Sequence, residues 1–469
     1  MNLKWAFEQY VEHLAGAVGH ADRRAPLADY CRGLLLPGER KSIEPMAARV
    51  APRQVSATHQ SLHHFVAQSA WEDAAVLGAV REYVLPRLTA ERPIEAWIVD
   101  DTGFPKKGTH SVGVARQYCG ERGKQDNCQV AVSVSLASPT ASLPVTWQLY
   151  LPQDWAADAE RRQRAGVPET VQFLTKPQIA LQHLDRLLAE GLPRHCVLAD
   201  AGYGVDAAFR RRLSTLGLPY LVGITSAVSV WPPDVEPLPP KRYHGRGRPP
   251  VQPRRTAKRQ PVTVKALAQA LPAHAFHTVH WREGTNQRLS SRFAAVRVRH
   301  AGGNHGRARL WPREWLLLEW PVTATEPEKY YLSTLPENAT LEELVQSAHQ
   351  RWRIERDYQE LKQEFGLDHY EGRGWRGFHH HASLCIAAYG FLLTERLSGH
   401  RPSSQKNSIR RQAPAVPADY TPRGRSPRAA PRREFDHHPA SSAQRAARRA
   451  RATLPVLRPT ESDQAFVTQ

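Results

Sequence analysis

The sequence has little of what marks a secreted, zinc-binding or membrane-spanning protein. Its five cysteines form no Cys-x-x-Cys pair, which argues against a zinc ribbon and a disulfide framework and fits a reducing compartment. No signal peptide opens the chain, and the longest apolar run, near residues 384–393, is too short to span a bilayer. We therefore expect a soluble cytoplasmic protein without a membrane partner.

Acidic residues are also scarce relative to basic ones. The 469 residues include 64 Lys and Arg but only 45 Asp and Glu, which gives a formal net charge of +19. An excess of this size favours a polyanionic partner, and nucleic acid is the first candidate. Ribosomal and membrane-surface proteins can be as basic, but they are rarely as long or as rich in tryptophan. We expect DNA as the partner and a nucleoid-associated location in the cytoplasm.

The hydrophobic pattern changes character several times along the chain. Residues 1–90 place apolar residues at helical spacing, and we expect a helical DNA-binding region there. Residues 91–225 give strand patterns and then alternate helix with strand, which predicts the first part of an α/β core. Residues 226–328 contain a proline-rich stretch, a basic run and further strand patterns, so we interpret them as an inserted β-rich subdomain.

The second part of the core is expected at residues 329–398, with one long helix over 341–365 and an apolar, buried helix over 382–396. Beyond it, residues 399–469 are rich in Pro, Ser, Ala and Arg. Such a segment cannot bury enough apolar surface to fold alone. It is either a disordered, basic, low-complexity tail that contacts DNA or an out-of-frame C-terminus, and the sequence does not separate the two.

The long predicted helix carries one acid between two cations. Arg351, Glu355 and Lys362 stand at i, i+4 and i+11, which return to nearly the same helix face. This arrangement suits a carboxylate that binds a metal while its neighbours hold phosphates. Taken alone, the stripe is more typical of a solvated helix face.

Two strand patterns upstream end in aspartate, at Asp100 and at Asp200. An ionised carboxylate just past a buried strand costs desolvation energy unless it is paired or binds metal. A strand-end turn or a helix cap is the plainer interpretation of either aspartate alone. Together with Glu355, however, they form a set of hard oxygen ligands for two Mg²⁺ ions, for which Mn²⁺ can substitute. Two such ions suit phosphoryl transfer.

The residues around these acids resemble a known family. The stretches at 98–108, 120–132, 198–204 and 351–355 are similar to motifs of the DDE transposases of bacterial insertion sequences. The branch is the one with a Y-R-E-K signature and a β insertion before the glutamate, and the insertion-sequence group numbered seven-zero-one is the nearest. The resemblance covers residues 7 to 396.

This resemblance implies an RNase H-like catalytic core that nicks element ends with water and then joins the freed 3′-OH to target DNA. Some relatives pass through a hairpin intermediate. It implies that Asp100, Asp200 and Glu355 are the catalytic, metal-binding acids, and that Arg351 and Lys362 are the arginine and lysine of the signature. The signature tyrosine is replaced by Ala348, which puts its DNA contact in doubt. Pairing two element ends implies a homodimer in a synaptic complex.

Several neighbouring acids compete with these assignments. Asp101 follows Asp100 directly, but side chains alternate along a strand, so only one of them points to a given face. The family pattern places the ligand at Asp100. Asp357, Glu360 and Glu364 share the predicted helix with Glu355 but lack its flanking cations, and we interpret them as solvent-exposed charges.

Further DNA contacts are predicted outside the acidic set. Lys106 and Lys107 follow the first aspartate and either hold phosphate or belong to a plain surface turn. Arg246 and Arg248 flank a glycine in the inserted region, in a short motif that suits insertion into an A·T minor groove or general phosphate contact.

Aromatic residues admit two interpretations each. Trp281 and Trp311 either stack on an extruded base or are buried in the β-rich region. The three histidines at 379–381 have no partnering acid or cysteine cluster, so we expect them to touch DNA or to lie on the surface.

The best interpretation is a two-metal-ion DDE transposase. Two rivals remain, namely an RNase H-like nuclease that cuts DNA without joining it, and a DNA-binding derivative that has lost its chemistry.

Overall fold

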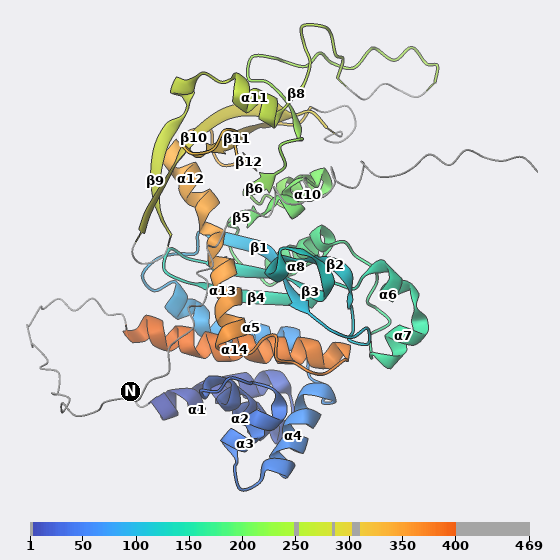
Figure 1. Cartoon of the computed structure of the whole chain (residues 1–469), viewed down its shortest axis with the longest axis vertical. Coiled ribbons are helices and arrows are strands. Elements are labelled where there is room, and N and C mark those ends of the chain that lie inside the picture. Colours follow the sequence, from blue (N-terminus) through green and yellow to red (C-terminus); the bar gives the residue numbers. More distant parts are fainter. Residues whose placement is uncertain (1–2, 248–252, 284–286, 303–309, 400–469) are drawn as a thin grey trace, which may run out of the picture. The chain divides into compact units, whose positions relative to one another are not determined.

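The computed structural model describes residues 3–247, 253–283, 287–302 and 310–399. The predicted tail beyond Gly399 and Arg248 of the basic motif therefore lie outside the described residues. Within this part, the predicted mixture of helices and a sheet is confirmed, with helices at the N-terminus and one large mixed sheet following them (Figure 1).

Five α-helices form the N-terminal region, as the helical spacing predicted. They are α1 (Leu3–Val18), α2 (Arg24–Leu35), α3 (Ile43–Val50), α4 (Val55–Ala67) and α5 (Asp73–Leu88), with a short 3-10 turn, η1 (Ala21–Arg23), between α1 and α2. α2, α4 and α5 pack on α14 (Trp375–Gly399), the long helix near the end of the described chain (Figure 1). Tyr10 of α1 donates to the carbonyl of Ala387 at 2.7 Å, and this buried hydrogen bond ties α1 to α14 as well.

Twelve strands of the described chain form one sheet, in the order β2-β3-β1-β5-β6-β12-β11-β10-β7-β8, with β4 also on β3 and β9 also on β10. The strands are β1 (Ala96–Pro105), β2 (Ala115–Cys119), β3 (Lys124–Ala137), β4 (Ser142–Leu149), β5 (Cys196–Ala199), β6 (Tyr220–Ile224), β7 (Ser229–Trp231), β8 (Val262–Thr263), β9 (His277–Glu283), β10 (Gln287–His300), β11 (Arg313–Trp320) and β12 (Lys329–Ser333).

The centre of the sheet is buried on both faces, and this is where the candidate site forms. β1 is antiparallel to β3 and parallel to β5, and β5 is parallel to β6. Trp97, Ile98 and Val99 of β1 have no exposed surface. Such near-continuous apolar runs are typical of strands with helices on both sides. Here α8 (Lys176–Ala189) packs on β3, and the helix carrying Glu355 packs on β1 and β4.

Five helices between β4 and β9 are short: α6 (Gln153–Ala157), α7 (Ala159–Arg164), α9 (Ala201–Gly204), α10 (Ala207–Thr215) and α11 (Val264–Ala270). The described chain also contains the 3-10 turns η2 (Gly120–Arg122) and η3 (Ala273–Ala275). None of the helices in the described ranges is long and apolar enough to cross a membrane.

The strands expected in residues 226–328 are present, and they extend the same sheet. β12 is antiparallel to β6, with Tyr330 opposite Ile224, and β11 and β10 follow it outward. The boundaries proposed for a separate subdomain stay a prediction.

The prediction of a single helix over 341–365 is wrong. This segment instead contains two helices, α12 (Leu341–Gln350) and α13 (Trp352–Gln363), which meet at Arg351. The two helices pack on different parts of the sheet: α12 contacts β9, β10 and β6, whereas α13 contacts β4 and β1. A turn between them lets each apolar face reach its own strands. Arg351 is therefore at a helix junction.

Candidate active site

The two aspartates lie next to each other on neighbouring parallel strands. Val99 of β1 pairs with Ala199 of β5, so the next residues, Asp100 and Asp200, lie side by side at the same level of the sheet. Adjacent strands are separated by about 4.8 Å. Asp100 does not end its strand as expected, because β1 continues to Pro105. Asp200 does end β5.

Asp200 is held by a tight turn onto the next strand. Its carboxylate accepts a hydrogen bond of 2.8 Å from the backbone N–H of Gly202 and caps the short helix α9. A Cβ at Gly204 would lie 1.9 Å from the carbonyl oxygen of Gly223 in β6. Only glycine allows this close approach. The Ala-Gly-Tyr-Gly motif at residues 201–204 therefore fixes the position of Asp200 on the sheet.

Arg351 joins the first aspartate to the glutamate. Its Nη1 lies 2.6 Å from Oδ2 of Asp100, and its Nη2 lies 2.5 Å from Oε1 of Glu355. The side chain of Asp100 is 12% exposed, that of Arg351 27% and that of Glu355 56%. One guanidinium thus bridges carboxylates from β1 and α13, at a junction that opens to solvent on the glutamate side.

The electrostatics of the site are those of an acid cluster with too few cations. Burial raises the pKa of Asp100 to about 8, although Arg351 opposes the rise, and the nearby charges of Asp200 and Asp101 add to it. Burial acts to lower the pKa of Arg351, but Asp100, Glu355 and Asp200 raise it above its ordinary value. Asp200 is therefore close enough to act on both partners of the Asp100–Arg351 pair.

Asp101 points to different partners. Lys176, at the start of α8, places Nζ 3.1 Å from Oδ1 of Asp101, and the hydroxyl of Tyr203 donates to its Oδ2 at 3.2 Å. Burial raises the pKa of this carboxyl, and Lys176 opposes the rise. Lys176 and Tyr203 were missed by the sequence reasoning. Tyr203 lies inside the Ala-Gly-Tyr-Gly motif, but no pattern links Lys176 to Asp101.

The carboxylates of the three predicted acids are ligands suited to a hard divalent cation. In this structure, however, Arg351 separates two of them. Asp100, Asp200 and Glu355 offer carboxylate oxygens, which Mg²⁺ prefers. Among the described residues, no group of three or more His, Cys, Asp or Glu side chains is arranged to hold a metal ion. The guanidinium of Arg351 lies between two of the three carboxylates, so the acids would have to rearrange around it to bind an ion.

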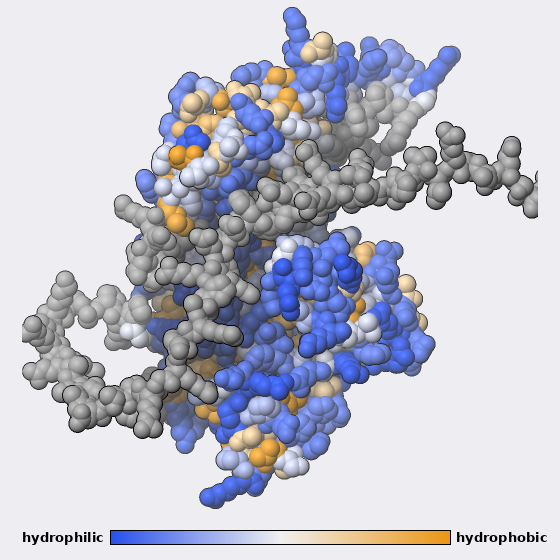
Figure 2. Space-filling view, in the orientation of Figure 1, coloured by the Kyte–Doolittle hydropathy of each residue, from blue (hydrophilic) through white to orange (hydrophobic). Residues whose placement is uncertain are grey.

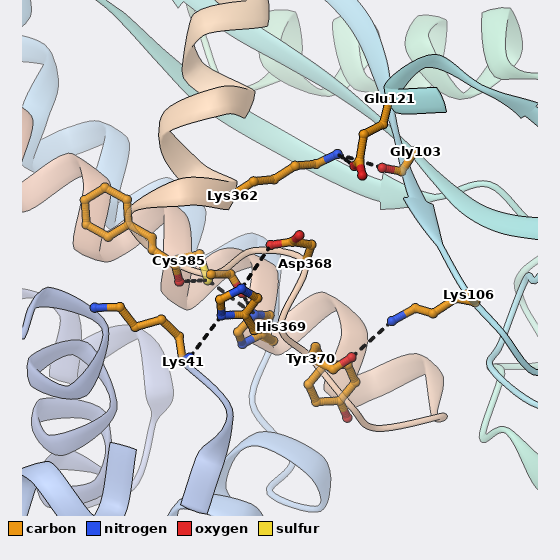
Figure 3. A network of polar contacts seen from close by, with 12 residues as sticks. Lys41, Gly103, Lys106, Glu121, Lys362, Asp368, His369, Tyr370 and Cys385 are labelled. Atoms are coloured by element: carbon orange, nitrogen blue, oxygen red, sulfur yellow. Dashed lines mark hydrogen bonds and ion pairs between the residues drawn. The ribbon is translucent and has the colours of Figure 1, made fainter. Parts of the chain in front are cut away.

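Lys362 is anchored beside the same strand (Figure 3). Its Nζ lies 2.7 Å from the carbonyl oxygen of Gly103 in β1 and 2.7 Å from Oε2 of Glu121 in η2. The ammonium also lies 5.0 Å from the ring centroid of Phe104, within cation–π range. Glu121 is a third residue that sequence reasoning missed, although it lies in the motif at residues 120–132.

The other predicted DNA-binding residues are more scattered. Lys106 donates to the carbonyl of Tyr370 at 3.1 Å, so its ammonium is partly engaged within the protein (Figure 3). Lys107 is exposed. Arg246 is exposed in the connection after β7, and Arg248 lies outside the described residues.

Asp357 is not the solvent-exposed charge that was expected. It is 3% exposed and accepts hydrogen bonds from Ser142 at 2.8 Å and Tyr389 at 3.0 Å. Burial raises its pKa to about 6. The prediction was wrong because the hydroxyl partners come from β4 and α14, far away in the sequence. Glu360 pairs with Arg396 and is also largely covered, whereas Glu364 is exposed as expected.

The expectation of surface histidines is also wrong. His379, His380 and His381 are all buried in α14. His380 stacks on Trp71 with ring centroids 3.5 Å apart, and Nδ1 of His381 is 2.8 Å from the hydroxyl of Tyr30. These rings satisfy polar groups between α14 and the N-terminal helices, which the local sequence does not reveal.

The tryptophans of the β-rich region have partners within the protein. Trp311 is 3% exposed, as the buried interpretation predicted. Trp281 stacks on His349 with ring centroids 3.9 Å apart.

Comparison with known proteins agrees with the motifs. The family model described as DDE superfamily endonuclease matches residues 13–288, more than half of the chain. The chain belongs to the DDE endonucleases. This match includes Asp100 and Asp200 but ends before Arg351 and Glu355.

One relative of this DDE endonuclease is described as a transposase. The chain is 36% identical over 168 residues to the probable transposase for insertion sequence element IS701 of Microchaete diplosiphon. The aligned stretch covers 36% of this chain and 41% of that protein, so it spans less than half of either. The predicted resemblance to DDE transposases of this group is confirmed at the level of family and distant homology.

Proposed function

We propose that this chain is a transposase that cuts the ends of an insertion sequence and joins them to target DNA by two-metal-ion phosphoryl transfer. One observation carries the proposal: Arg351 bridges Asp100 and Glu355, while the register of β1 and β5 puts Asp200 beside Asp100. Two of the three acids contact one cation and the third lies on the neighbouring strand, so a modest rearrangement around Arg351 would let them share metal ions.

The strand order supports an RNase H-like core. β4, β3 and β1 form an antiparallel series, and β5 and β6 continue it in parallel on the other side of β1. Helices follow β4 and β5 and pack on the sheet. In this arrangement the first two acids stand at the centre of the sheet and the third comes from a helix across its face.

In the proposed mechanism, Asp100, Asp200 and Glu355 would hold two Mg²⁺ ions, or Mn²⁺ in their place. When bound, such ions activate an attacking oxygen and stabilise the leaving oxygen of a phosphodiester. Arg351 would turn from a carboxylate to the DNA phosphate, for which its planar fork is suited. Lys362 would add a second cation, and its anchorage on Gly103 keeps it beside β1.

The remaining parts of the chain would bind DNA at a distance from the chemistry. The N-terminal helices and the basic motif with Arg246 and Arg248 are proposed to recognise element ends, with Lys106 and Lys107 holding phosphates nearby. A homodimer would pair two ends. The excess of positive charge supports DNA as the partner.

The test is an assay with purified protein, labelled element-end DNA and Mg²⁺. We expect cleavage and a strand-transfer product. Asp100→Asn, Asp200→Asn and Glu355→Gln should each lower the cleavage rate by on the order of 10²–10³-fold or more while leaving DNA binding intact. Cleavage without any joined product would favour the rival nuclease. DNA binding without cleavage would favour the impaired derivative.

A further inference from the structure

A basic cavity lies apart from the acidic cluster. It has a volume of about 250 Å³ and is lined by residues including His110, Trp155, Arg161, Arg164 and Arg373. Its walls come from three segments: the connection between β1 and β2, the helices α6 and α7, and the start of α14 (Figure 1). No Asp or Glu is among the residues that line it.

Hydrogen bonds between these segments hold the walls of the cavity in place before any ligand binds. The backbone N–H of Val112 donates to the carbonyl of Arg373 at 2.9 Å, and that of Trp375 donates to Ala165 at 2.8 Å. The indole N–H of the buried Trp155 donates to the carbonyl of Val114 at 2.8 Å. The cavity is therefore part of the fold, and binding there would need little ordering of the backbone.

The arginines around the cavity have few partners that would neutralise their charge. The guanidinium of Arg161 stacks on Trp155, with Cζ 3.8 Å from the ring centroid, and one of its nitrogens donates to Thr109 at 2.9 Å. Arg164 is 3.4 Å from Glu160, but both side chains are more than two-thirds exposed, and such pairs are weak. Within the described chain, the side chain of Arg373 has no ion pair or hydrogen bond.

A neighbouring arginine differs from these three because its guanidinium is bonded within the protein. Arg162, on the same short helix, donates to the carbonyls of Ala156, Pro168 and Val171. Arg162 thus has a structural role. Arg161, Arg164 and Arg373 have few such partners, and these three guanidinium groups concentrate positive charge around one cavity. The surface over α6 and α7 is mostly hydrophilic (Figure 2).

We propose that this cavity binds a backbone phosphate of DNA, as a second contact separate from the acidic site. The inference rests on the proposed function, which makes DNA the substrate. Guanidinium groups suit phosphate oxygens, and a cavity open to solvent can admit a phosphodiester while the rest of the strand stays outside. The β1–β2 connection, which contributes His110 to the cavity, also carries Lys106 and Lys107.

The experiment measures DNA binding and needs no metal or cleavage. Fluorescence anisotropy with a short duplex in EDTA, at several salt concentrations, is compared for the wild-type chain, Arg373→Gln and the double variant Arg164→Gln/Arg373→Gln. We expect each lost phosphate contact to weaken binding several-fold and to reduce the slope of log K against log[salt] by about 1. Arg92→Gln, an exposed change before the opposite end of β1, removes the same single charge as Arg373→Gln and should keep the wild-type slope.

Two results would overturn the inference. One is a wild-type slope in the double variant, with unchanged thermal melting showing that it is folded. The other is protection of the wild-type chain against heat by inorganic phosphate or a nucleoside triphosphate, lost in the double variant, with DNA affinity unchanged; the cavity would then serve a small phosphate. A wild-type chain that binds no duplex at all would instead remove the proposed function as well.

Discussion

Arg351 and Asp100, 251 residues apart in the chain, are joined by a hydrogen bond of 2.6 Å. The cation stands at the junction of two helices, and the acid lies in the most buried part of the sheet. Burial and the nearby acids disfavour the charged form of Asp100 by raising its pKa, and Arg351 is the cation that opposes this rise.

The stability of the metal-free protein should therefore depend on Arg351. Arg351→Gln leaves Asp100 and Glu355 without their shared partner, and we expect a loss of about 2–3 kcal/mol in the free energy of unfolding. Urea denaturation in EDTA measures it. Arg356→Gln, an exposed change on the same helix, is the control and should lie within about 0.5 kcal/mol of wild type. Equal stability of the two variants would contradict the pairing.

The two adjacent aspartates should differ in their effects. Asp100→Asn should lower cleavage by on the order of 10²–10³-fold. Asp101→Asn should keep most of the activity but lower stability, because it leaves Lys176 and Tyr203 without their carboxylate partner. Single-turnover cleavage and thermal melting separate the two effects. If Asp101→Asn lost more activity than Asp100→Asn, the assignment of the first ligand would move to Asp101.

Much of the fold could be predicted because its signals are local. Helical spacing gave the N-terminal helices, and apolar runs gave β1 and β5. The motifs gave the family. The sequence placed Asp100 and Asp200 after two apolar strand patterns, whereas the parallel pairing of Val99 with Ala199, which puts the two acids on adjacent strands, is seen only in the structure.

The rest depended on contacts between distant segments. Asp357 and the histidines at 379–381 look like surface residues because their partners, such as Ser142 and Tyr30, lie far away in the chain. The break at Arg351 arises because α12 and α13 pack on different strands. Nothing within residues 341–365 shows where those strands lie, so the sequence predicts one uninterrupted helix.

Glu314 should give the protein a pH-dependent stability that is independent of the candidate site. This carboxyl is fully buried between Tyr220 and Arg210, and burial raises its pKa from 4.5 to about 7, against the opposing charge of Arg210. The folded state keeps the proton that the unfolded state loses, so stability falls as pH rises from about 4.5 to about 7. The fall should be at most about 3 kcal/mol.

Glu314→Gln should remove that part of the pH dependence, whereas Glu337→Gln, an exposed change, should retain it. Urea denaturation of the three proteins across this pH range is the measurement. Parallel curves for wild type and Glu314→Gln would show that the buried carboxyl does not retain its proton.

Glu121 should compete with DNA for Lys362. The ammonium of Lys362 contacts the carboxylate of Glu121 and the carbonyl oxygen of Gly103, each at 2.7 Å. A DNA phosphate that binds Lys362 must displace the carboxylate of Glu121 or share the ammonium with it. The side chain of Glu121 is 40% exposed, so the pair contributes no more than about 1 kcal/mol. Glu121→Gln should accordingly tighten DNA binding by about two- to five-fold at low salt. The gain should disappear in Glu121→Gln/Lys362→Gln when it is compared with Lys362→Gln. A gain that persists without the lysine would mean that Glu121 repels DNA directly and does not act through Lys362.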